Sequence, residues 1–150
     1  MKKSTQHFLD AIVQETNIFL KEDMLLDIVE VSLETNSALR SHCSFIELEG
    51  VGKVIVAIAI QDSLFDILFN TFFKDGVSVD EKDELIEALP HEIINTVVGL
   101  AIRRFPKEYA GLELGIPVGV DENIDFENIH SAEATIKTSV GDFVCKVSAE

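Results

Sequence analysis

The sequence has few basic residues for its number of acidic ones. Lysine and arginine together number 12, against 27 aspartates and glutamates, and the formal net charge is −15. Such a chain gains no counterion release at nucleic-acid phosphates, and anionic membrane surfaces repel it. We therefore expect neither nucleic acid nor a membrane as a partner. A partner with a positive patch is favoured in the rate of encounter.

Cysteines are also scarce, and long apolar runs are missing. The two cysteines, Cys43 and Cys145, make no disulfide framework, and each alternates with apolar residues, which predicts reduced and mostly buried thiols. The longest apolar run, from Val54 to Ile60, has seven residues, whereas a membrane-spanning helix needs about 20. Polar residues follow Met1-Lys2-Lys3, so no signal peptide is predicted. We expect a soluble, cytoplasmic protein.

Apolar residues are nevertheless abundant, at 47% of the 150 residues. A chain of this length buries about two-thirds of its surface, and it does not need a metal or a disulfide to stabilise the fold. No linker or low-complexity tract divides it. We therefore expect a single domain over residues 1–150.

Hydrophobic periodicity predicts an α+β domain. Helical spacing occurs over 5–20, 64–73 and 80–105. Strand-like patterns cover 29–33 (half-buried), 43–49, 51–60, 112–120, 132–138 and 143–148. The strand over 51–60 is apolar at nearly every position, which predicts a central place in the sheet. The order and its two hairpins indicate a largely antiparallel sheet of about six strands, with about three helices packed on it.

Pro90 lies inside the third predicted helix. A proline there removes one hydrogen bond and clashes with the carbonyl four residues before it. Leu89 would be a poor N-cap, so we predict one continuous, kinked helix rather than two helices.

Sites for common chemistries are absent or incomplete. The four histidines (His7, His42, His91 and His130) lie on different elements without metal-ligand spacing. His91-Glu92-Ile93-Ile94-Asn95 differs at one position from the His-Glu-x-x-His helix of zinc proteases. That position is Asn95, and a neutral amide is a poor zinc ligand. We therefore expect no metal site.

Glu92 and Asn95 are three residues apart and project from one face of the predicted helix. A carboxylate beside a carboxamide can engage a cation and orient a water molecule. Taken alone, such a pair is more typical of an ordinary solvated helix face.

The stretch Glu92-Ile93-Ile94-Asn95-Thr96-Val97-Val98-Gly99, followed by Ile116-Pro117, resembles the signature of the CheC/CheX family of chemotaxis phosphatases. In that family Glu-x-x-Asn lies in mid-helix and a proline follows in the next strand; here Pro117 follows Asn95 by 22 positions. The order of elements is similar over nearly the whole chain. Residues 66–70 lack a second Glu-x-x-Asn, so the single-site, CheX-like branch fits better.

The resemblance implies a phosphatase of the phospho-aspartate of a CheY-like response regulator. Asn95 would insert its carboxamide and align the attacking water, and Glu92 would pair with the regulator's active-site lysine. Mg²⁺ would belong to the partner, and this chain would carry no cofactor of its own. The resemblance also implies a homodimer that pairs through its sheets.

The chain departs from the family pattern at two positions near the pair. Ala88 stands where the family often has Asp or Ser, and Pro90 precedes Glu92 by two residues. The alternative hypothesis is therefore a non-catalytic domain of the same fold, which binds a response regulator or another protein without turnover.

Overall fold

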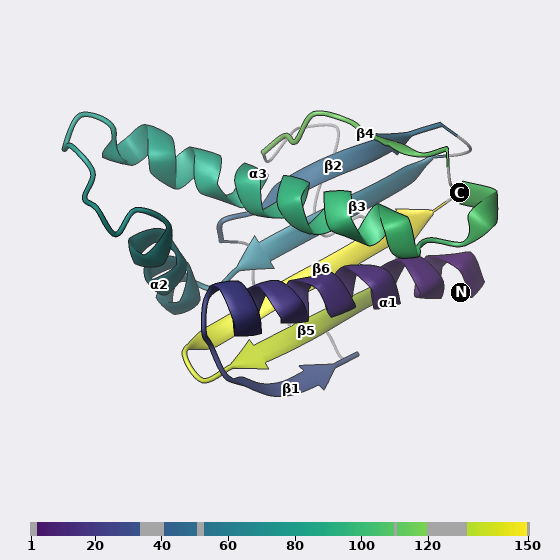
Figure 1. The fold of residues 1–150 in the computed structure, drawn as a ribbon, viewed down its shortest axis with the longest axis horizontal. Helices are drawn as coiled ribbons and strands as arrows, with labels where there is room; N and C mark the ends of the chain where they lie inside the picture. Colours follow the sequence, from purple (N-terminus) through teal and green to yellow (C-terminus); the bar gives the residue numbers. More distant parts are fainter. Residues whose placement is uncertain (1–2, 34–40, 51–52, 110, 120–131, 150) are drawn as a thin grey trace.

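The elements follow the predicted order in the computed structural model, which describes residues 3–33, 41–50, 53–109, 111–119 and 132–149 (Figure 1). In chain order they are α1 (Lys3–Ile18), a π-helical turn (Phe19–Asp23), β1 (Ile28–Ser32), β2 (Ser44–Glu49), β3 (Val54–Ile60), α2 (Asp62–Phe72), α3 (Lys82–Ala101), 3₁₀ turns at Ile102–Arg104 and Lys107–Tyr109, β4 (Glu113–Leu114), β5 (Ala132–Thr138) and β6 (Gly141–Ala149).

The six described strands form one sheet in the order β1-β5-β6-β3-β2-β4, and every neighbouring pair is antiparallel. The central place predicted for β3 is confirmed. Its residues are buried on both faces: Val56 and Ile58 belong to the main core, whereas Ala57 and Ala59 form a second, smaller cluster. Since successive side chains of a strand point to opposite faces, the two clusters lie on opposite sides of the sheet.

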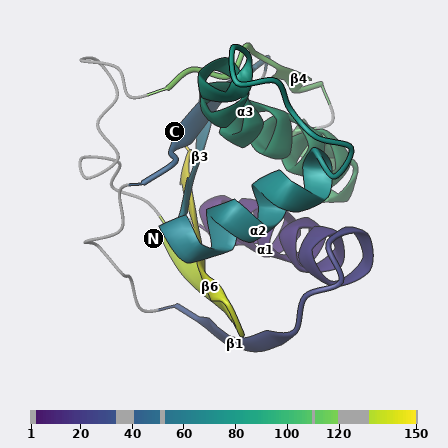
Figure 2. The same cartoon turned by 90° about the vertical axis from the view of Figure 1, so that its left-hand side faces the viewer.

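Two long helices cover one face of the sheet. α1 and α3 lie side by side across it, as both views show (Figures 1 and 2). The main core fills the space between them and the strands, and its largest buried side chains include Phe8, Leu9, Ile12, Ile46, Ile58 and Phe143. Each such side chain stabilises the fold by about 1.5–3 kcal/mol through the removal of its surface from water. The two-layer α+β architecture is therefore as predicted.

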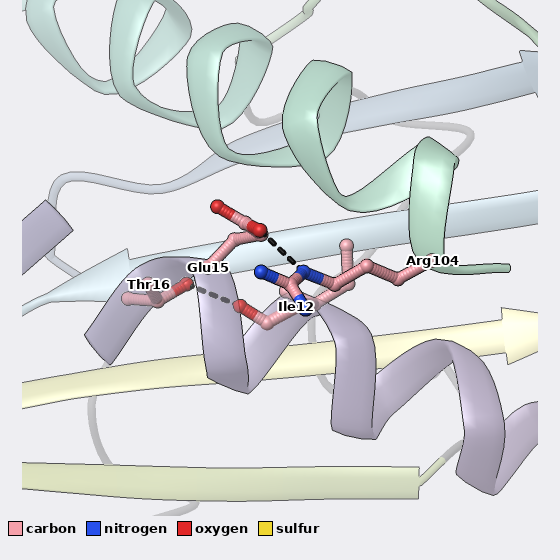
Figure 3. A network of polar contacts seen from close by, with 4 residues as sticks. All are labelled: Ile12, Glu15, Thr16 and Arg104. Atoms are coloured by element: carbon pink, nitrogen blue, oxygen red, sulfur yellow. Dashed lines mark hydrogen bonds and ion pairs between the residues drawn. The ribbon is translucent and has the colours of Figure 1, made fainter. Parts of the chain in front are cut away.

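A partly buried ion pair connects the turn after α3 to α1. Arg104 follows α3 in a 3₁₀ turn, and its Nε donates to Oε1 of Glu15 on α1 (Figure 3). Thr16 donates from Oγ1 to the carbonyl of Ile12 one turn earlier, at 2.7 Å. Glu15 is almost fully buried, so the removal of Arg104 would leave a buried carboxylate without its charged partner.

Two predicted strands differ from the structure. The predicted half-burial of the first strand is wrong, because β1 lies at the sheet edge and leaves Val29 and Val31 exposed, at 70% and 41%. The strand predicted over 112–120 is a regular strand only at Glu113–Leu114, with one isolated bridge at Val118. Leu48 follows Phe45 by three positions on β2, whereas Val118 follows Leu114 by four positions, so the pairing is interrupted by a bulge.

The predicted continuity of the third helix through Pro90 is confirmed, although α3 begins at Lys82 rather than at residue 80. By length and composition, the described segment Lys82–Arg104 is long and apolar enough to cross a membrane. In this fold its apolar stripe instead packs into the core against the sheet, as the core helix of a soluble protein does.

Candidate functional site

The sequence pattern of α3 turns the Glu92/Asn95 pair outward. Ile93, Ile94 and Val97 are buried in the main core and fix the helix on the sheet. Glu92 and Asn95 lie on the other side of the helix and are exposed. The predicted exposure of this carboxylate and carboxamide is therefore confirmed, and both groups are free to meet another molecule.

The two departures from the family pattern have different surroundings. Ala88, one turn before Glu92, is exposed and presents only a methyl group at that position. Pro90 is buried against the core, so its ring contributes apolar contact. It has no N–H, and the carbonyl of Ile86 therefore receives no hydrogen bond from residue 90.

A hydrogen bond connects α3 to the sheet directly after this proline. His91 Nδ1 lies 2.6 Å from Oγ of Ser44, the first residue of β2. Ser44 is fully buried and His91 is half-buried. This contact has no signal in the sequence, because 47 positions separate the two residues and no local pattern links them.

The segment after β4 runs alongside the same stretch of α3. A Cβ on Gly99 would stand 3.4 Å from Cδ1 of Leu114, and one on Gly119 would stand 3.9 Å from Cε1 of His91. The chain between Leu114 and Gly119 therefore runs antiparallel to α3 from Gly99 back to His91. It passes beside the turn that holds Asn95.

Pro117 lies within this edge segment. The next residue, Val118, donates to the carbonyl of Phe45 at 2.8 Å and accepts from the Phe45 N–H at 2.9 Å. In an antiparallel pair the neighbours of such a residue turn their N–H groups away from the partner strand. Proline lacks that N–H, so it fits this edge position without the loss of a bond to β2. The proline of the resemblance thus lies on the segment that flanks Asn95.

The surface of α3 around the pair is acidic. Asp83, Glu84 and Glu87 are exposed on its N-terminal half, before Glu92. Two of them, Asp83 and Glu84, lie in the first turn, where carboxylates are stabilised by the helix dipole. Because Lys82 is the one exposed basic residue of the described helix before Glu92, the net charge of this half of α3 is negative, which favours the approach of a cationic group.

A cavity of about 480 Å³ opens beside α3 and is lined by His42, Cys43, Asp83, Ile86, Glu87, Pro90, His91 and Gly119. His42 stacks on Phe65 of α2 with ring centroids 3.6 Å apart, and its Nε2 lies 2.9 Å from Oδ1 of Asp62.

Among the described residues, no group of three or more histidine, cysteine, aspartate or glutamate side chains is placed to hold a metal ion. Of the other histidines, His7 is exposed and His130 lies outside the described residues.

Neither of the two predicted thiols is part of a disulfide. Cys145 is fully buried on β6, as expected, whereas Cys43 is half-buried at the cavity. Burial raises the pKa of the Cys145 thiol to about 12, and a hydrogen bond with Thr16 lowers it only in part.

Comparison with known proteins gives matches among solved structures. No protein-family model matches this sequence, and no curated protein matches it. CheX from Desulfovibrio desulfuricans has a TM-score of 0.73 and 13% identity, over 95% of this chain and 99% of its own. CheX from Vibrio vulnificus has a TM-score of 0.68 and 16% identity, with the same coverage.

A third similar structure is a CheX-CheY-BeF₃-Mg²⁺ complex from Borrelia burgdorferi. It has a TM-score of 0.60 and 12% identity, over 95% of this chain and 97% of the other. These three structures match nearly the full length of both chains, and the matched region of this chain includes its sheet and helices. The chain therefore has the fold of the CheX and CheC-like chemotaxis proteins.

Proposed function

We propose that this protein is a phosphatase that hydrolyses the phospho-aspartate of a CheY-like response regulator. The observation that supports this most directly is the exposed Glu92/Asn95 pair in the middle of α3, in a CheX-like fold. The solved CheX–CheY complex supports a partner of this class, since it pairs a protein of the same fold with CheY. Because a fold can host several functions, the proposal depends on the chemistry of the pair.

Asn95 would act by position. Its carboxamide offers one acceptor oxygen and two N–H donors, which can hold a water molecule in line with the scissile bond. The water oxygen would form a bond to phosphorus while the bond from phosphorus to the aspartyl oxygen breaks. The products are inorganic phosphate and a free aspartate. An amide is not a base, and in-line phosphoryl transfer gains mainly from alignment and charge stabilisation.

Glu92 would hold the complex together. Its exposed carboxylate would pair with the regulator's active-site lysine, which places Asn95 one helical turn away at the phosphoryl group. The acidic side chains earlier on α3 would favour the approach of this lysine-bearing surface. Mg²⁺ would be held by the regulator, and no step on this chain would require a metal or cofactor of its own.

A non-catalytic regulator-binding domain is the second candidate. Ala88 and Pro90 favour it, because both differ from the family pattern within one turn of Glu92. Such a protein would bind the phosphorylated regulator without shortening the lifetime of its phosphate. In either case we propose a soluble, cytoplasmic protein that forms a homodimer.

The test uses CheY-like regulators encoded near this gene, phosphorylated with a small-molecule donor. Wild-type protein should accelerate phosphate release. Asn95→Ala should abolish most of the rate while affinity for the regulator changes little, because it removes the guide for the water. Glu92→Ala should weaken both binding and rate, because it removes the partner of the lysine. Truncation of an exposed helix residue should leave the fold intact.

Two exposed residues outside the acidic stretch of α3 provide matched controls. Thr96→Ala removes a neighbouring polar group of α3, and Asp66→Ala removes a carboxylate of equal charge from α2. Both should retain nearly full activity. Wild-type protein that binds a regulator but leaves its phosphate lifetime unchanged would support the binding domain instead. Equal rates for wild type, Asn95→Ala and Glu92→Ala would exclude the pair from the mechanism.

A further inference from the structure

We propose that His91 is a positioning residue, whose hydrogen bond to Ser44 sets the rotation of α3 about its axis and thereby the direction of Asn95. The effect of this bond on the rate rests on the proposed function. Its effect on the orientation of the helix rests on the structure alone.

The bond joins a fixed point of the sheet to the functional turn of the helix. Ser44 begins β2 and has no exposed surface, and its backbone pairs with Ile58 of β3. Its Oγ lies 2.6 Å from His91 Nδ1, which is a short hydrogen bond for an oxygen and a nitrogen. A serine hydroxyl can donate or accept, so the contact does not depend on one tautomer of the imidazole.

The bond lies at a weak point of α3. Pro90 provides no N–H for the carbonyl of Ile86, so one bond of the helical ladder is missing immediately before His91. Helices bend at such positions. A connection to β2 at the next residue therefore limits how far the second half of the helix can turn relative to the sheet.

The bond is also close to the reactive pair. His91 and Asn95 are four residues apart and share a helix face, and Glu92 is the neighbour of His91. On its other side the imidazole lies against the edge segment, because a Cβ on Gly119 would be 3.9 Å from Cε1 and 4.0 Å from Nε2. The ring therefore lies between Ser44 of β2 and this segment, at the cavity beside α3.

The apolar contacts of α3 do not set its rotation as sharply. Ile93, Ile94, Val97 and Val98 are buried, but hydrophobic burial is non-directional. A hydrogen bond weakens steeply once its angle falls below about 120°. A rotation of α3 that keeps the apolar stripe buried would strain the Ser44–His91 bond and move the carboxamide of Asn95. A displacement of about 1 Å at a reacting group can reduce a rate by about a hundredfold.

The test compares two amide replacements of His91 with the removal of its partner. In His91→Asn the amide occupies the position of Nδ1 and can still bond Ser44, whereas in His91→Gln it reaches the position of Nε2. We expect His91→Gln and Ser44→Ala each to lower kcat by about tenfold or more, while KM for the phosphorylated regulator stays within about twofold. His91→Asn should stay within about threefold of wild type. The double variant Ser44→Ala/His91→Gln should be no worse than either single one, since both remove the same bond.

A merely structural role would give a different result. In that case thermal stability would fall in all variants while kcat of the folded protein stayed at the wild-type value, and this would overturn the proposal. A loss of kcat in His91→Asn as large as that in His91→Gln would overturn it as well.

A second readout does not depend on activity. Residual dipolar couplings of the backbone N–H groups report the orientation of α3 relative to β2 and β3 in the free protein. Ser44→Ala should change the couplings of residues 91–98 relative to the sheet, whereas Thr96→Ala should not. Unchanged couplings in Ser44→Ala would overturn the inference even if the wild-type protein proved to be an active phosphatase. Changed couplings would support the positioning of the helix even if it proved to be inactive.

Discussion

Cys145 has no exposed surface, and burial raises the pKa of its thiol to about 12 from an ordinary value of 9.0. The folded state therefore keeps the thiol proton to a higher pH than the unfolded state does. The stability that the neutral thiol contributes is fully present below about pH 9 and is lost as the pH rises towards 12. At neutral pH this thiol is protonated and inaccessible, and both conditions prevent it from acting as a nucleophile.

We predict that alkylation distinguishes the two thiols. Iodoacetamide at pH 8 should modify the half-buried Cys43 of the folded protein and leave Cys145 unmodified, whereas both should react in urea. Mass spectrometry of the intact protein and of its peptides measures this directly. The variant Cys43→Ser should then take up no label while it is folded. Equal labelling of both thiols under native conditions would contradict the packing described for β6.

Two glycines near the site differ in what surrounds them, and alanine substitution should separate them. Gly99 lies inside α3, where a Cβ would meet Leu114 at an ordinary contact distance of 3.4 Å. Gly99→Ala should therefore stabilise the protein by about 0.5–1 kcal/mol, because glycine is a poor helix former. At Gly115 a Cβ would stand 2.4 Å from the Glu47 carbonyl oxygen. Gly115→Ala should destabilise by roughly 1–3 kcal/mol, because the edge segment must move away from β2.

Urea denaturation of both variants and of wild type measures these two shifts. The midpoint should rise for Gly99→Ala and fall for Gly115→Ala, without a change in slope. If both substitutions lowered the midpoint equally, the close approach between α3 and Leu114 would be tighter than described.

At the scale of the elements, α3 shows how much local pattern can predict. Its apolar spacing predicted one long helix, and because Leu89 would be a poor N-cap, the helix was predicted to continue through Pro90. The three-residue spacing of Glu92 and Asn95 predicted that they share a face. The structure confirms the continuity and the exposure of the pair. Each of these features depends on residues within a few turns of one another, so the sequence contains the information directly.

The edges of the sheet show where that information ends. The burial of β1 depends on its place beside β5, and the shortness of β4 depends on the bulge after Leu114, where Gly115 meets β2. The Ser44–His91 bond joins residues 47 positions apart, and neither residue has a pattern of its own. Side-chain periodicity predicts which face of its own element a residue occupies. It does not predict which strand lies at the edge of the sheet or which polar atoms meet between elements.

At the scale of the whole molecule, β1 and β4 are the two edge strands of the sheet that the described residues form. An exposed edge strand offers unpaired backbone groups to another chain, and most soluble proteins protect such edges with charge or closure. β1 instead carries apolar side chains into solvent, with Val29, Val31 and the following Leu33 exposed at 70%, 41% and 68%. A two-fold contact between sheets at this edge would cover these side chains in both copies at once, because a symmetric interface uses the same surface twice.

We therefore predict a homodimer with β1 in its interface, so that lysines introduced into β1 should weaken the dimer. Wild-type protein should run as a dimer in size-exclusion chromatography with light scattering, and Val29→Lys/Val31→Lys should shift it towards the monomer at the same concentration. Val79→Lys is the matched control, because Val79 is also an exposed valine, at 91%, but lies before α3 and away from the sheet edge. It should leave the dimer intact.

A wild-type protein that stays monomeric from micromolar to millimolar concentration would exclude the dimer, and a dimer that survives the double substitution would place its interface elsewhere. Because the Glu92/Asn95 pair lies on α3 rather than on β1, the monomeric variant should keep its activity per chain, which separates assembly from catalysis.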